Sequence, residues 1–400
     1  MTKLEEFVLS KIDRMEVANI LSDLIKAPSC YPPGDTRDVA NVCFNFFEKN
    51  NIRAQKTALE PELPSCIGQI GDSERPNLVF HSHIDTVPAG DLSRWTYGPF
   101  DGVIKDGIVW GRGAGDCKGS TAVQLAAIKA IKDSGIQLNG LLTVACVTDE
   151  ENCGAKGTKW LRETKQLDPD YLVIGEQTEN KIALGERQAI WVKITVEGKA
   201  SHGAIPWEGE NAIVRMSYVI QELEEYLKPK IENKTHVYLP KSTISINRIT
   251  GGVKENVVPE SCSISIDRRV LPNESYETVK AEFKEVIEKV KTKIGDFPYS
   301  IDLIIDQGPS VHTSVDEKMV KLFEDATKEI NGKASPLIGY AQGSDGRWFA
   351  EDNIPIVIFG PSDPNVGHTV DEHCTIDQLY DGARILTLLA MRVLGVREKE

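Results

Sequence analysis

Two patterns of apolar and polar residues divide the chain. In residues 1–182, short stretches that are apolar throughout alternate with stretches in which apolar residues recur every three or four positions. The first pattern predicts strands buried on both faces, and the second predicts amphipathic helices. In residues 183–306 the strands instead alternate apolar and polar side chains, which is typical of an antiparallel sheet with one solvated face. Residues 307–400 return to the first pattern, so the sequence predicts an α/β domain that carries an inserted module.

The α/β part alternates predicted helices and strands. Helical spacing covers residues 4–26, 37–49, 120–133 and 319–330. Apolar strands cover residues 77–80, 108–110, 141–147, 171–174 and 355–359. In folds of this class, functional side chains gather just beyond the carboxyl ends of the strands. We therefore expect the site of this protein at those strand ends.

The inserted module has a different order of elements. Its predicted strands are 191–197, 242–249, 261–270 and 299–306, and its predicted helices are 211–227 and 276–294. The order β-α-β-β-α-β is that of a ferredoxin-like unit. A chain of 400 residues also exceeds a single comfortable core. We expect three segments: 1–182 and 307–400 form one domain, and 183–306 forms the insertion.

Charge and composition narrow the class of protein. The chain has 46 basic and 60 acidic residues, a net charge of −14, which argues against nucleic acid and anionic membrane as partners. No apolar run reaches membrane-spanning length, and the first residues lack the apolar segment of a signal peptide, so we expect a cytoplasmic protein. The eight cysteines are scattered without a CxxC pair, so neither a zinc ribbon nor disulfides are implied.

A glycine-rich segment follows the strand at 108–110. It reads Gly-Arg-Gly-Ala-Gly-Asp-Cys-Lys-Gly from Gly111 to Gly119, and it leaves one carboxylate, Asp116, at the start of a helix. An aspartate there could simply cap the helix. Polar residues at the other strand ends favour a different interpretation, in which Asp116 is shared by two metal ions.

Histidine and carboxylate side chains follow the other strands. His83 and Asp85 come directly after the strand at 77–80, with His81 on the same face, and this spacing suits a metal-binding imidazole oriented by a neighbouring carboxylate. Glu150 and Glu151 close the next apolar strand, where burying two unpaired carboxylates would be costly. One of the pair could bind metal while the other acts as a general base.

Two more side chains complete the predicted set. Glu176 ends the strand at 171–174, and His368 follows the strand at 355–359. Two histidines and three carboxylates suit a co-catalytic metal pair that shares one bridging carboxylate. The candidate metal ligands are His83, Asp116, one of the pair Glu150 and Glu151, Glu176 and His368.

Several motifs resemble one family of zinc amidohydrolases. The matching segments are HIDTVPAG from His83, GRGAGDCKG, TDEENCGAKG, IGEQT, GKASHGAIPWEGENAI, NVVP, DRRVLP, GSDGRWF and GHTVDE. They resemble the family that holds succinyl-diaminopimelate desuccinylase, acetylornithine deacetylase, aminoacylase and glutamate carboxypeptidase. The resemblance implies a mixed-sheet α/β catalytic domain of the di-zinc peptidase type, with a ferredoxin-like insertion that serves as lid and dimerisation domain.

The resemblance also implies roles for the metal-site residues. His83 and Glu176 would hold one zinc ion, and Glu151 and His368 the other, with Asp116 as the bridge. Glu150 would be the general base, and Asp85 would orient His83. Cobalt or manganese could replace zinc.

Further residues would contact the substrate. His202 resembles the family's lid histidine, which reaches the active site of the partner subunit in a homodimer and steadies the oxyanion. Asn256, Arg269, Gly343 and Ser344 match substrate-facing positions, and a guanidinium such as that of Arg269 can clamp a carboxylate with two parallel bonds. Arg268 stands beside Arg269, so either arginine could form this clamp.

The substrate is expected to be an N-acyl amino acid or a short peptide. The segment GSDGRWF resembles the desuccinylases more than the acetylornithine enzymes. Desuccinylation is therefore the favoured activity, by a narrow margin. Deacetylation and carboxypeptidase or dipeptidase activity are the alternatives.

Two alternatives come from other classes of protein. A dinucleotide-binding oxidoreductase could use the glycines from Gly111 to Gly115, but their spacing lacks the third glycine of the fingerprint. A metal-free binding relative should have lost metal ligands, whereas all five are present.

Cys117 and Cys153 lie within the motifs, but the sequence indicates no base that would activate either thiol as a nucleophile, so both are interpreted as packing residues. The histidines without motif support, which we expect to be surface or structural residues, are His236, His312 and His373.

Overall fold

The computed structural model describes residues 1–397 and divides into two compact units. The first unit comprises Met1–Gly185, His312–Tyr340 and Ser344–Glu400, and the second comprises Glu186–Val311 and Ala341–Gly343. The sequence analysis places residues 341–343 in the last segment of the chain, whereas this tripeptide groups with the second unit. The predicted fold class is confirmed: a large mixed sheet with helices, and a separate antiparallel α+β unit inserted into its chain.

An eight-stranded mixed sheet forms the centre of the first unit. Its order is β1-β2-β6-β3-β7-β14-β8-β13. The strands are β1 (Arg53–Thr57), β2 (Ser65–Ile70), β3 (Asn77–His83), β6 (Leu141–Val147), β7 (Tyr171–Ile174), β8 (Ile182–Glu186), β13 (Leu337–Tyr340) and β14 (Ile356–Ile358). The central strands β6, β3, β7 and β14 run parallel, so their carboxyl ends share one edge. Every residue of β3 and β6 is buried, as the apolar sequence of β6 and the apolar run Leu78–Phe80 of β3 predict.

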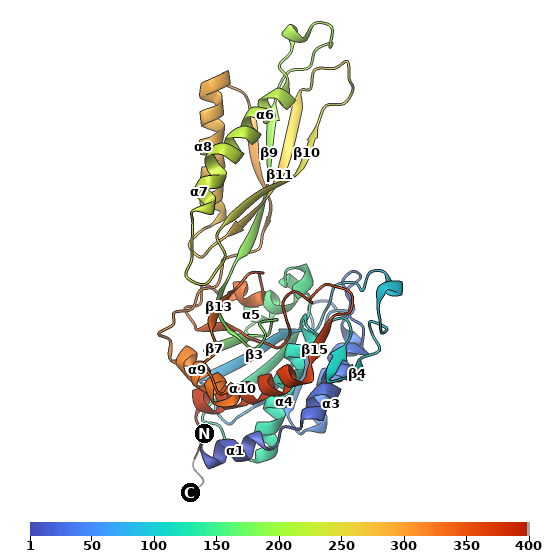
Figure 1. Cartoon of the computed structure of the whole chain (residues 1–400), viewed down its shortest axis with the longest axis vertical. Helices are drawn as coiled ribbons and strands as arrows, with labels where there is room; N and C mark the ends of the chain where they lie inside the picture. The colour runs from blue at the N-terminus through green and yellow to red at the C-terminus, as the bar shows by residue number, and fades with distance from the viewer. Residues whose placement is uncertain (398–400) are drawn as a thin grey trace. The chain divides into compact units, whose positions relative to one another are not determined.

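Helices α4 and α10 pack against β3 and β6 (Figure 1). The helices of this unit are α1 (Lys3–Leu9), α2 (Arg14–Ile25), α3 (Arg37–Lys49), α4 (Lys118–Ser134), α5 (Trp160–Glu163), α9 (Lys318–Asn331) and α10 (Ile376–Leu394). The apolar run at 4–26 is two helices rather than one, because the Asp13 carboxylate accepts a hydrogen bond from the amide of Glu16 and starts α2. None of the helices within residues 1–397 is both long and apolar enough to span a membrane.

A small three-stranded sheet brings distant segments of the first unit together. Its order is β15-β5-β4, with β4 at Val103–Lys105, β5 at Ile108–Trp110 and β15 at His373–Thr375. The pairing of β5 with β15 places the loop before β15 beside the glycine-rich segment that follows β5. The amide of Gly111 donates to the carbonyl of Glu372 at 2.9 Å.

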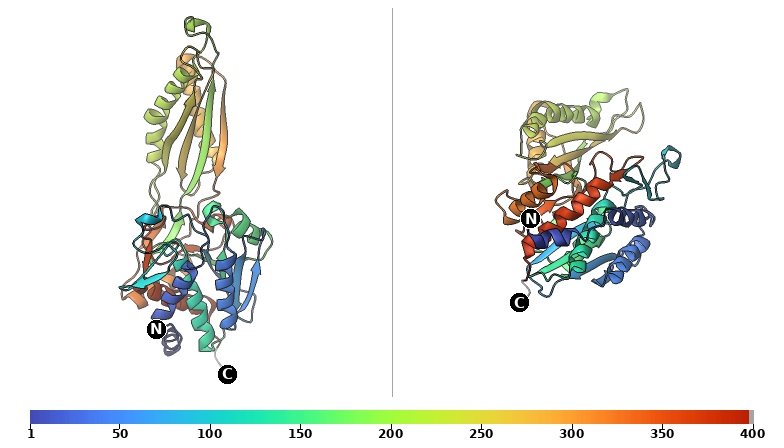
Figure 2. Two further views of the ribbon diagram at one scale, coloured as in Figure 1. Left: turned by 90° about the vertical axis from the view of Figure 1, so that its right-hand side faces the viewer. Right: turned by 60° about the horizontal axis from the view of Figure 1, so that its bottom comes forward.

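The second unit has the predicted β-α-β-β-α-β order. Its sheet has the order β10-β11-β9-β12, with β9 at Gln188–Glu197, β10 at Thr243–Gly251, β11 at Ser261–Val270 and β12 at Tyr299–Asp306. Helices α6 (Ala212–Glu222) and α8 (Tyr276–Ile294) cover one face of this sheet (Figure 2). The predicted helix at 211–227 continues past α6 as a π-helical turn and then as α7 (Lys228–Glu232).

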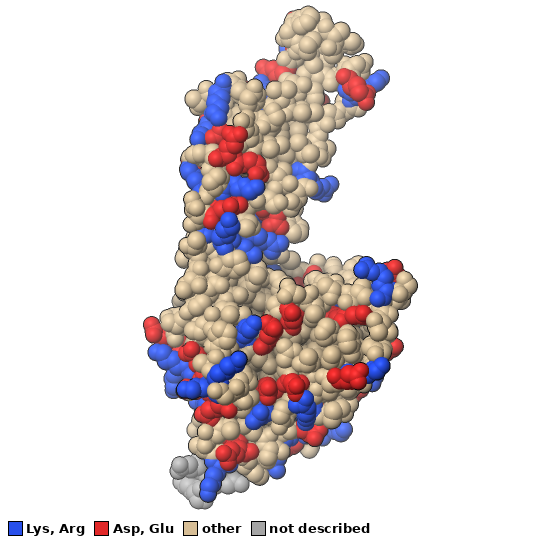
Figure 3. All heavy atoms as spheres, in the orientation of Figure 1, with Lys and Arg blue, Asp and Glu red and all other residues tan. Residues whose placement is uncertain are grey.

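Charged side chains of both signs cover the outer surface of α7 and α8 (Figure 3). Lys230 pairs with Glu285 at 3.1 Å, and Lys289 pairs with Glu222 at 2.8 Å. Lys230 and Glu285 are both exposed, whereas Glu222 is buried beneath Lys289. Their interspersed signs give this surface no continuous basic patch.

Candidate metal centre

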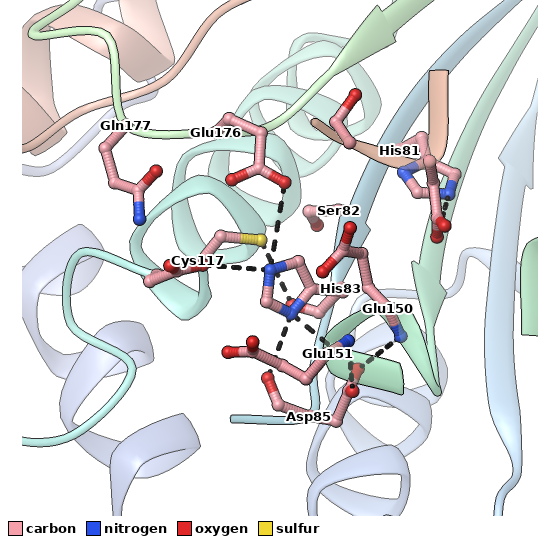
Figure 4. Close-up of polar contacts among 12 residues, drawn as sticks. His81, Ser82, His83, Asp85, Cys117, Glu150, Glu151, Glu176 and Gln177 are labelled. Carbon is pink, nitrogen blue, oxygen red and sulfur yellow. Dashed lines mark hydrogen bonds and ion pairs between the residues drawn. The ribbon is translucent and has the colours of Figure 1, made fainter. Parts of the chain in front are cut away.

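The predicted site residues of the first unit lie around the carboxyl ends of its parallel strands. His83 ends β3, Glu150 and Glu151 follow β6, and Glu176 follows β7. Figure 4 shows Asp85, Cys117 and Glu176 around the imidazole of His83. The parallel direction of the strands is the reason that residues so far apart in the sequence meet here.

One tautomer of His83 is selected by its neighbour two residues on. The Nδ1 atom donates to the backbone carbonyl of Asp85 at 2.9 Å, which leaves Nε2 as the acceptor or ligand atom. The Asp85 carboxylate lies 3.7 Å from Nδ1 and accepts hydrogen bonds from the amides of Glu150 and Glu151, at 3.3 and 3.0 Å. Asp85 therefore orients the ring through its main chain, and its side chain fixes the turn that carries the two glutamates.

Asp116 lies between the two histidines. Its Oδ1 atom is 3.0 Å from Nε2 of His83, and its Oδ2 atom is 3.1 Å from Nε2 of His368. Glu151 Oε1 lies 3.1 Å from the same atom of His368, and Glu176 Oε1 lies 3.8 Å from Nε2 of His83. One carboxylate thus faces two imidazoles, each of which has a further carboxylate beside it.

The backbone of Asp116 is held by a glutamate that the sequence analysis does not assign. Glu372 Oε1 accepts from the amides of Gly115 and Asp116 at 2.9 and 2.8 Å, and its other oxygen pairs with Arg112. Both side chains of this ion pair are buried. Glu372 is the second acidic residue of the segment GHTVDE. Its position four residues after His368 was the feature of the sequence that could have indicated a role at the metal site.

The side chains of the centre carry strongly shifted pKa values. Burial, reinforced by the nearby Asp116 carboxylate, raises the pKa of Glu151 to about 7 and that of Glu176 well above its ordinary value. Hydrogen bonds to Asp116 and Glu151 raise the pKa of His368 to about 10. Burial opposes ionisation of Asp116, but the hydrogen bonds to His368 and His83 outweigh it and lower the pKa. A group of carboxylates this close together favours a bound cation.

The donor atoms fit metal ions. The set formed by His83, Asp116 and Glu151 offers ligand atoms that lie within 4.8 Å of one another, and so does the set formed by His83, Cys117 and Glu176. Imidazole and carboxylate are ligands that zinc accepts in catalytic sites. The Cys117 thiol lies 3.3 Å from the backbone carbonyl of His83, so it packs against the main chain of this predicted metal ligand.

Two further side chains contact the predicted metal ligand Glu176 and the predicted general base Glu150. Tyr340 places its hydroxyl 2.6 Å from Gln177 Oε1 and 3.1 Å from Glu176 Oε2. Arg347 donates through Nη2 to Glu150 Oε1 at 2.7 Å. Arg347 lies in the segment GSDGRWF, but the sequence alone gives no reason to pair it with Glu150.

The remaining predicted residues lie mostly in the second unit. His202 and Asn256 are exposed there on neighbouring loops, joined by a 2.8 Å hydrogen bond from the amide of Gly203 to the carbonyl of Asn256. Arg269 pairs with Asp267 at 3.0 Å.

The structure separates the two adjacent arginines. Arg268 is fully buried in the second unit and is paired with Glu274, whereas the Arg269 side chain is partly exposed. Arg269 therefore remains the arginine that a ligand could reach. Gly343 belongs to the second unit, while Ser344 is buried in the first unit, where its hydroxyl accepts from the amide of Gly346 at 3.1 Å.

We expect the metal-free protein to lose thermal stability as the pH rises from about 4.5 to about 7. The pKa of Glu151 is about 7 in the folded protein, above its ordinary value of 4.5, so the folded state binds more protons than the unfolded chain between these values. The resulting stabilisation is complete below the unfolded value and is lost as the pH rises through about 7. His368, with a pKa of about 10, acts in the same direction.

Calorimetry in the presence of a chelator measures this loss. Metal-loaded protein is the control, because a bound cation keeps the carboxylates ionised throughout this range. Glu151→Gln should weaken the pH dependence of the metal-free protein. Equal slopes with and without metal would contradict the explanation.

The comparisons with known proteins place the chain in a family. Residues 79–392 match the model of Peptidase family M20/M25/M40, so the chain belongs to that family. It is 25% identical over 396 residues to a protein of Staphylococcus aureus (strain MRSA252) named "Probable succinyl-diaminopimelate desuccinylase", covering 92% of this chain and 95% of the relative.

Two solved structures share the fold. Aminopeptidase PepT from Bacillus cereus superposes with a TM-score of 0.77 at 20% identity, covering 96% of this chain and 99% of the other. The Bacillus subtilis YXEP protein, described as a dinuclear metal binding peptidase from the M20 family, gives a TM-score of 0.70 at 17% identity, with 96% and 99% covered. As a member of this family the protein is a metal-dependent amidohydrolase. The alternative of a dinucleotide-binding oxidoreductase is thereby excluded.

Proposed function

We propose that the protein hydrolyses the amide bond of an N-acyl amino acid and that N-succinyl-diaminopimelate, or a close analogue, is its substrate. The observation that carries the proposal is the position of the Asp116 carboxylate between the imidazoles of His83 and His368. Glu150 lies next in the chain to Glu151, another carboxylate of the same site. This arrangement suits a hydrolase with two metal ions that share one carboxylate.

The ligands divide into two groups around Asp116. His83 and Glu176 would hold one zinc ion, and Glu151 and His368 would hold the other, with Asp116 shared. Zinc is proposed because imidazole and carboxylate together suit it, and cobalt or manganese could replace it. When bound, the pair supplies Lewis acidity and lowers the pKa of a coordinated water.

The side chains of this chain supply the proton transfers and the orientation. Glu150 would accept a proton from the attacking water and pass it to the leaving amine, because it is adjacent to a ligand without being assigned as one. Asp85 would hold His83 and the glutamate turn in place through the contacts described above. The carboxylate of Glu150 would keep one oxygen on Arg347 during these steps.

The second unit would supply groups for binding. His202 would stabilise the oxyanion, and Arg269 would clamp the substrate carboxylate. Three more residues, Asn256, Gly343 and Ser344, would contact the substrate.

The choice of substrate rests on two observations. The segment GSDGRWF resembles that of the desuccinylases, and a relative covering most of this chain carries the desuccinylase name. Deacetylation of N-acetylornithine is the second candidate reaction among those that act on N-acyl amino acids. Cleavage of short peptides is favoured by the structural likeness to an aminopeptidase.

We also propose that residues 183–306 act as the lid and as the contact of a homodimer. The second unit exposes several large apolar side chains, among them Trp207 with 75% of its surface exposed. Exposed apolar residues grouped on one unit are typical of an interaction surface. The others on α6 and the adjacent loop are Ile205, Ile213, Val214 and Tyr218.

Hydrolysis of a small panel by the zinc-loaded protein tests the proposed substrate. The panel contains N-succinyl-diaminopimelate, N-acetylornithine, several N-acetyl amino acids and a few dipeptides, with release of the free amine as the signal. We expect kcat/KM for the succinyl compound to exceed the others by at least about tenfold, which corresponds to about 1.4 kcal/mol of differential transition-state binding. Broad, weak peptide cleavage would overturn the choice of substrate, and protein that binds no metal would overturn the mechanism.

A further inference from the structure

The segment Ser344–Phe349 of the first unit belongs to a buried hydrogen-bond network. This network contacts Glu150, the proposed general base. We propose that Arg347 is a positioning residue that holds one carboxylate oxygen of Glu150, so that the other oxygen is the one available for proton transfer. This inference rests on the proposed function, because it takes Glu150 as the base.

The guanidinium of Arg347 is fixed at two points. Its Nη2 atom donates to Glu150 Oε1 at 2.7 Å, and its Nε atom donates to the backbone carbonyl of Ser344 at 2.7 Å. Only 4% of the residue is exposed. A planar guanidinium held by its own main chain can present a donor in only a few directions, which a flexible lysine ammonium does not reproduce.

The helical turn that carries Arg347 is itself anchored. It spans Asp345–Trp348 and begins at Ser344, whose hydroxyl accepts the amide of Gly346. Asp345 is fully buried and accepts a 2.6 Å hydrogen bond from the hydroxyl of Thr158. That hydroxyl lies 2.8 Å from Nε2 of His81 on β3. His81 therefore belongs to this network, and its imidazole is not one of the metal-site imidazoles (Figure 4).

The turn that carries Glu150 is in direct contact with the same segment. Gly154, four residues after Glu150, has a φ angle of +66°, and a Cβ atom placed on it would overlap Asp345 Oδ1. A glycine is therefore required for the two segments to approach so closely. The segments that carry the base and Arg347 are thus joined twice, once by the ion pair and once by the close approach of Gly154 to the side chain of Asp345.

A purely structural role makes a different prediction from a positioning role. An ion pair that only stabilises the fold would change stability and leave the turnover of folded, metal-loaded enzyme unchanged. A positioning residue changes kcat, since a misplaced base costs rate even when substrate still binds. The geometry favours positioning, because Arg347 contacts the reactive carboxylate itself.

Substituting Arg347 in wild-type and Glu150→Asp backgrounds tests the proposal. We expect Arg347→Met to lower kcat about 10²-fold on the best substrate, with KM changed less than about threefold and two metals still bound per subunit. Arg347→Lys should recover only part of the loss, whereas free guanidinium should increase kcat of the methionine variant. In the Glu150→Asp background the same substitution should cost much less, because residues that act through each other are not additive. Arg162→Met is the matched control, since Arg162 forms a comparable pair with Asp352 at the surface and should retain wild-type kcat.

Full additivity of the two substitutions, or an unchanged kcat for Arg347→Met, would overturn the proposal. If the wild-type protein hydrolyses no member of the panel, the proposed function has failed, and the contact is then judged by melting temperature. Arg347→Met should lower the melting temperature of the metal-loaded protein, because the charge of Glu150 is left buried and unpaired, and Glu150→Gln should restore part of it. Additive shifts in melting temperature would overturn the proposed contact without reference to turnover.

Discussion

Glu150→Gln is expected to lower kcat by about 10³-fold while the protein still binds two metal ions, since general-base catalysis contributes about 10²–10⁴ in rate. The amide is close to the carboxylate in size and can still accept from Arg347 Nη2, which donates to Glu150 Oε1 at 2.7 Å. It cannot take up the proton of the attacking water. Steady-state kinetics on the preferred substrate and metal analysis of the same samples measure the two quantities.

A matched control separates loss of the base from loss of charge. Glu163 is an exposed glutamate on α5 that lies 3.9 Å from Lys159, and Glu163→Gln should retain wild-type kcat. Wild-type turnover by the Glu150→Gln variant would remove Glu150 from the mechanism. Loss of metal from that variant would instead show that Glu150 is a ligand.

Asp116→Ala is expected to abolish the binding of both metal ions and, with it, detectable hydrolysis. Its two carboxylate oxygens lie 3.0 Å from His83 and 3.1 Å from His368, so one substitution removes a ligand from each ion. By contrast, His368→Ala removes a ligand from one ion only and should leave close to one tightly bound metal per subunit.

Metal analysis after dialysis, together with titration of the apoprotein with zinc, measures this difference. Asp91→Asn is the control, because Asp91 is exposed, is not one of the predicted ligands, and accepts hydrogen bonds through its carboxylate from nearby Ser93. Circular dichroism should show that both variants are folded. Retention of two ions by Asp116→Ala would contradict the bridging role.

Local sequence patterns were sufficient for the central parallel strands of the first unit and for the order of elements in the second. β6 and β7 are almost entirely apolar, and β3 is apolar from Leu78 to Phe80, so the polar residues that follow these apolar runs marked the edge where His83, Glu151 and Glu176 meet. The edge strand β1 and its neighbour β2 were not predicted, since β1 (Arg-Ala-Gln-Lys-Thr) has almost no apolar face. Helix α10 was also missed, although its buried residues recur at helical spacing.

The contacts that surround the ligands could not be derived from local pattern. Glu372 binds the amide of Asp116 across 256 positions of sequence, and this depends on the pairing of β15 with β5. Likewise, Arg347 reaches Glu150 across 197 positions. Such long-range contacts follow from the complete fold, because a charge in a loop has many possible partners until the strands are placed.

The insertion of the second unit into the chain of the first has a consequence for the order in which the protein is made. Glu176 and His368 are separated by 368 − 176 = 192 positions, which include all of β9 to β12. A ribosome that adds about 5–20 residues per second needs about 10–40 s to synthesise that interval. During this time the nascent chain already carries His83, Asp116, Glu151 and Glu176, but it has neither His368 nor the Glu372 that holds the Asp116 backbone. One of the two proposed metal ions would therefore find its proposed ligands before synthesis ends, whereas the other would have to wait for the last tenth of the protein.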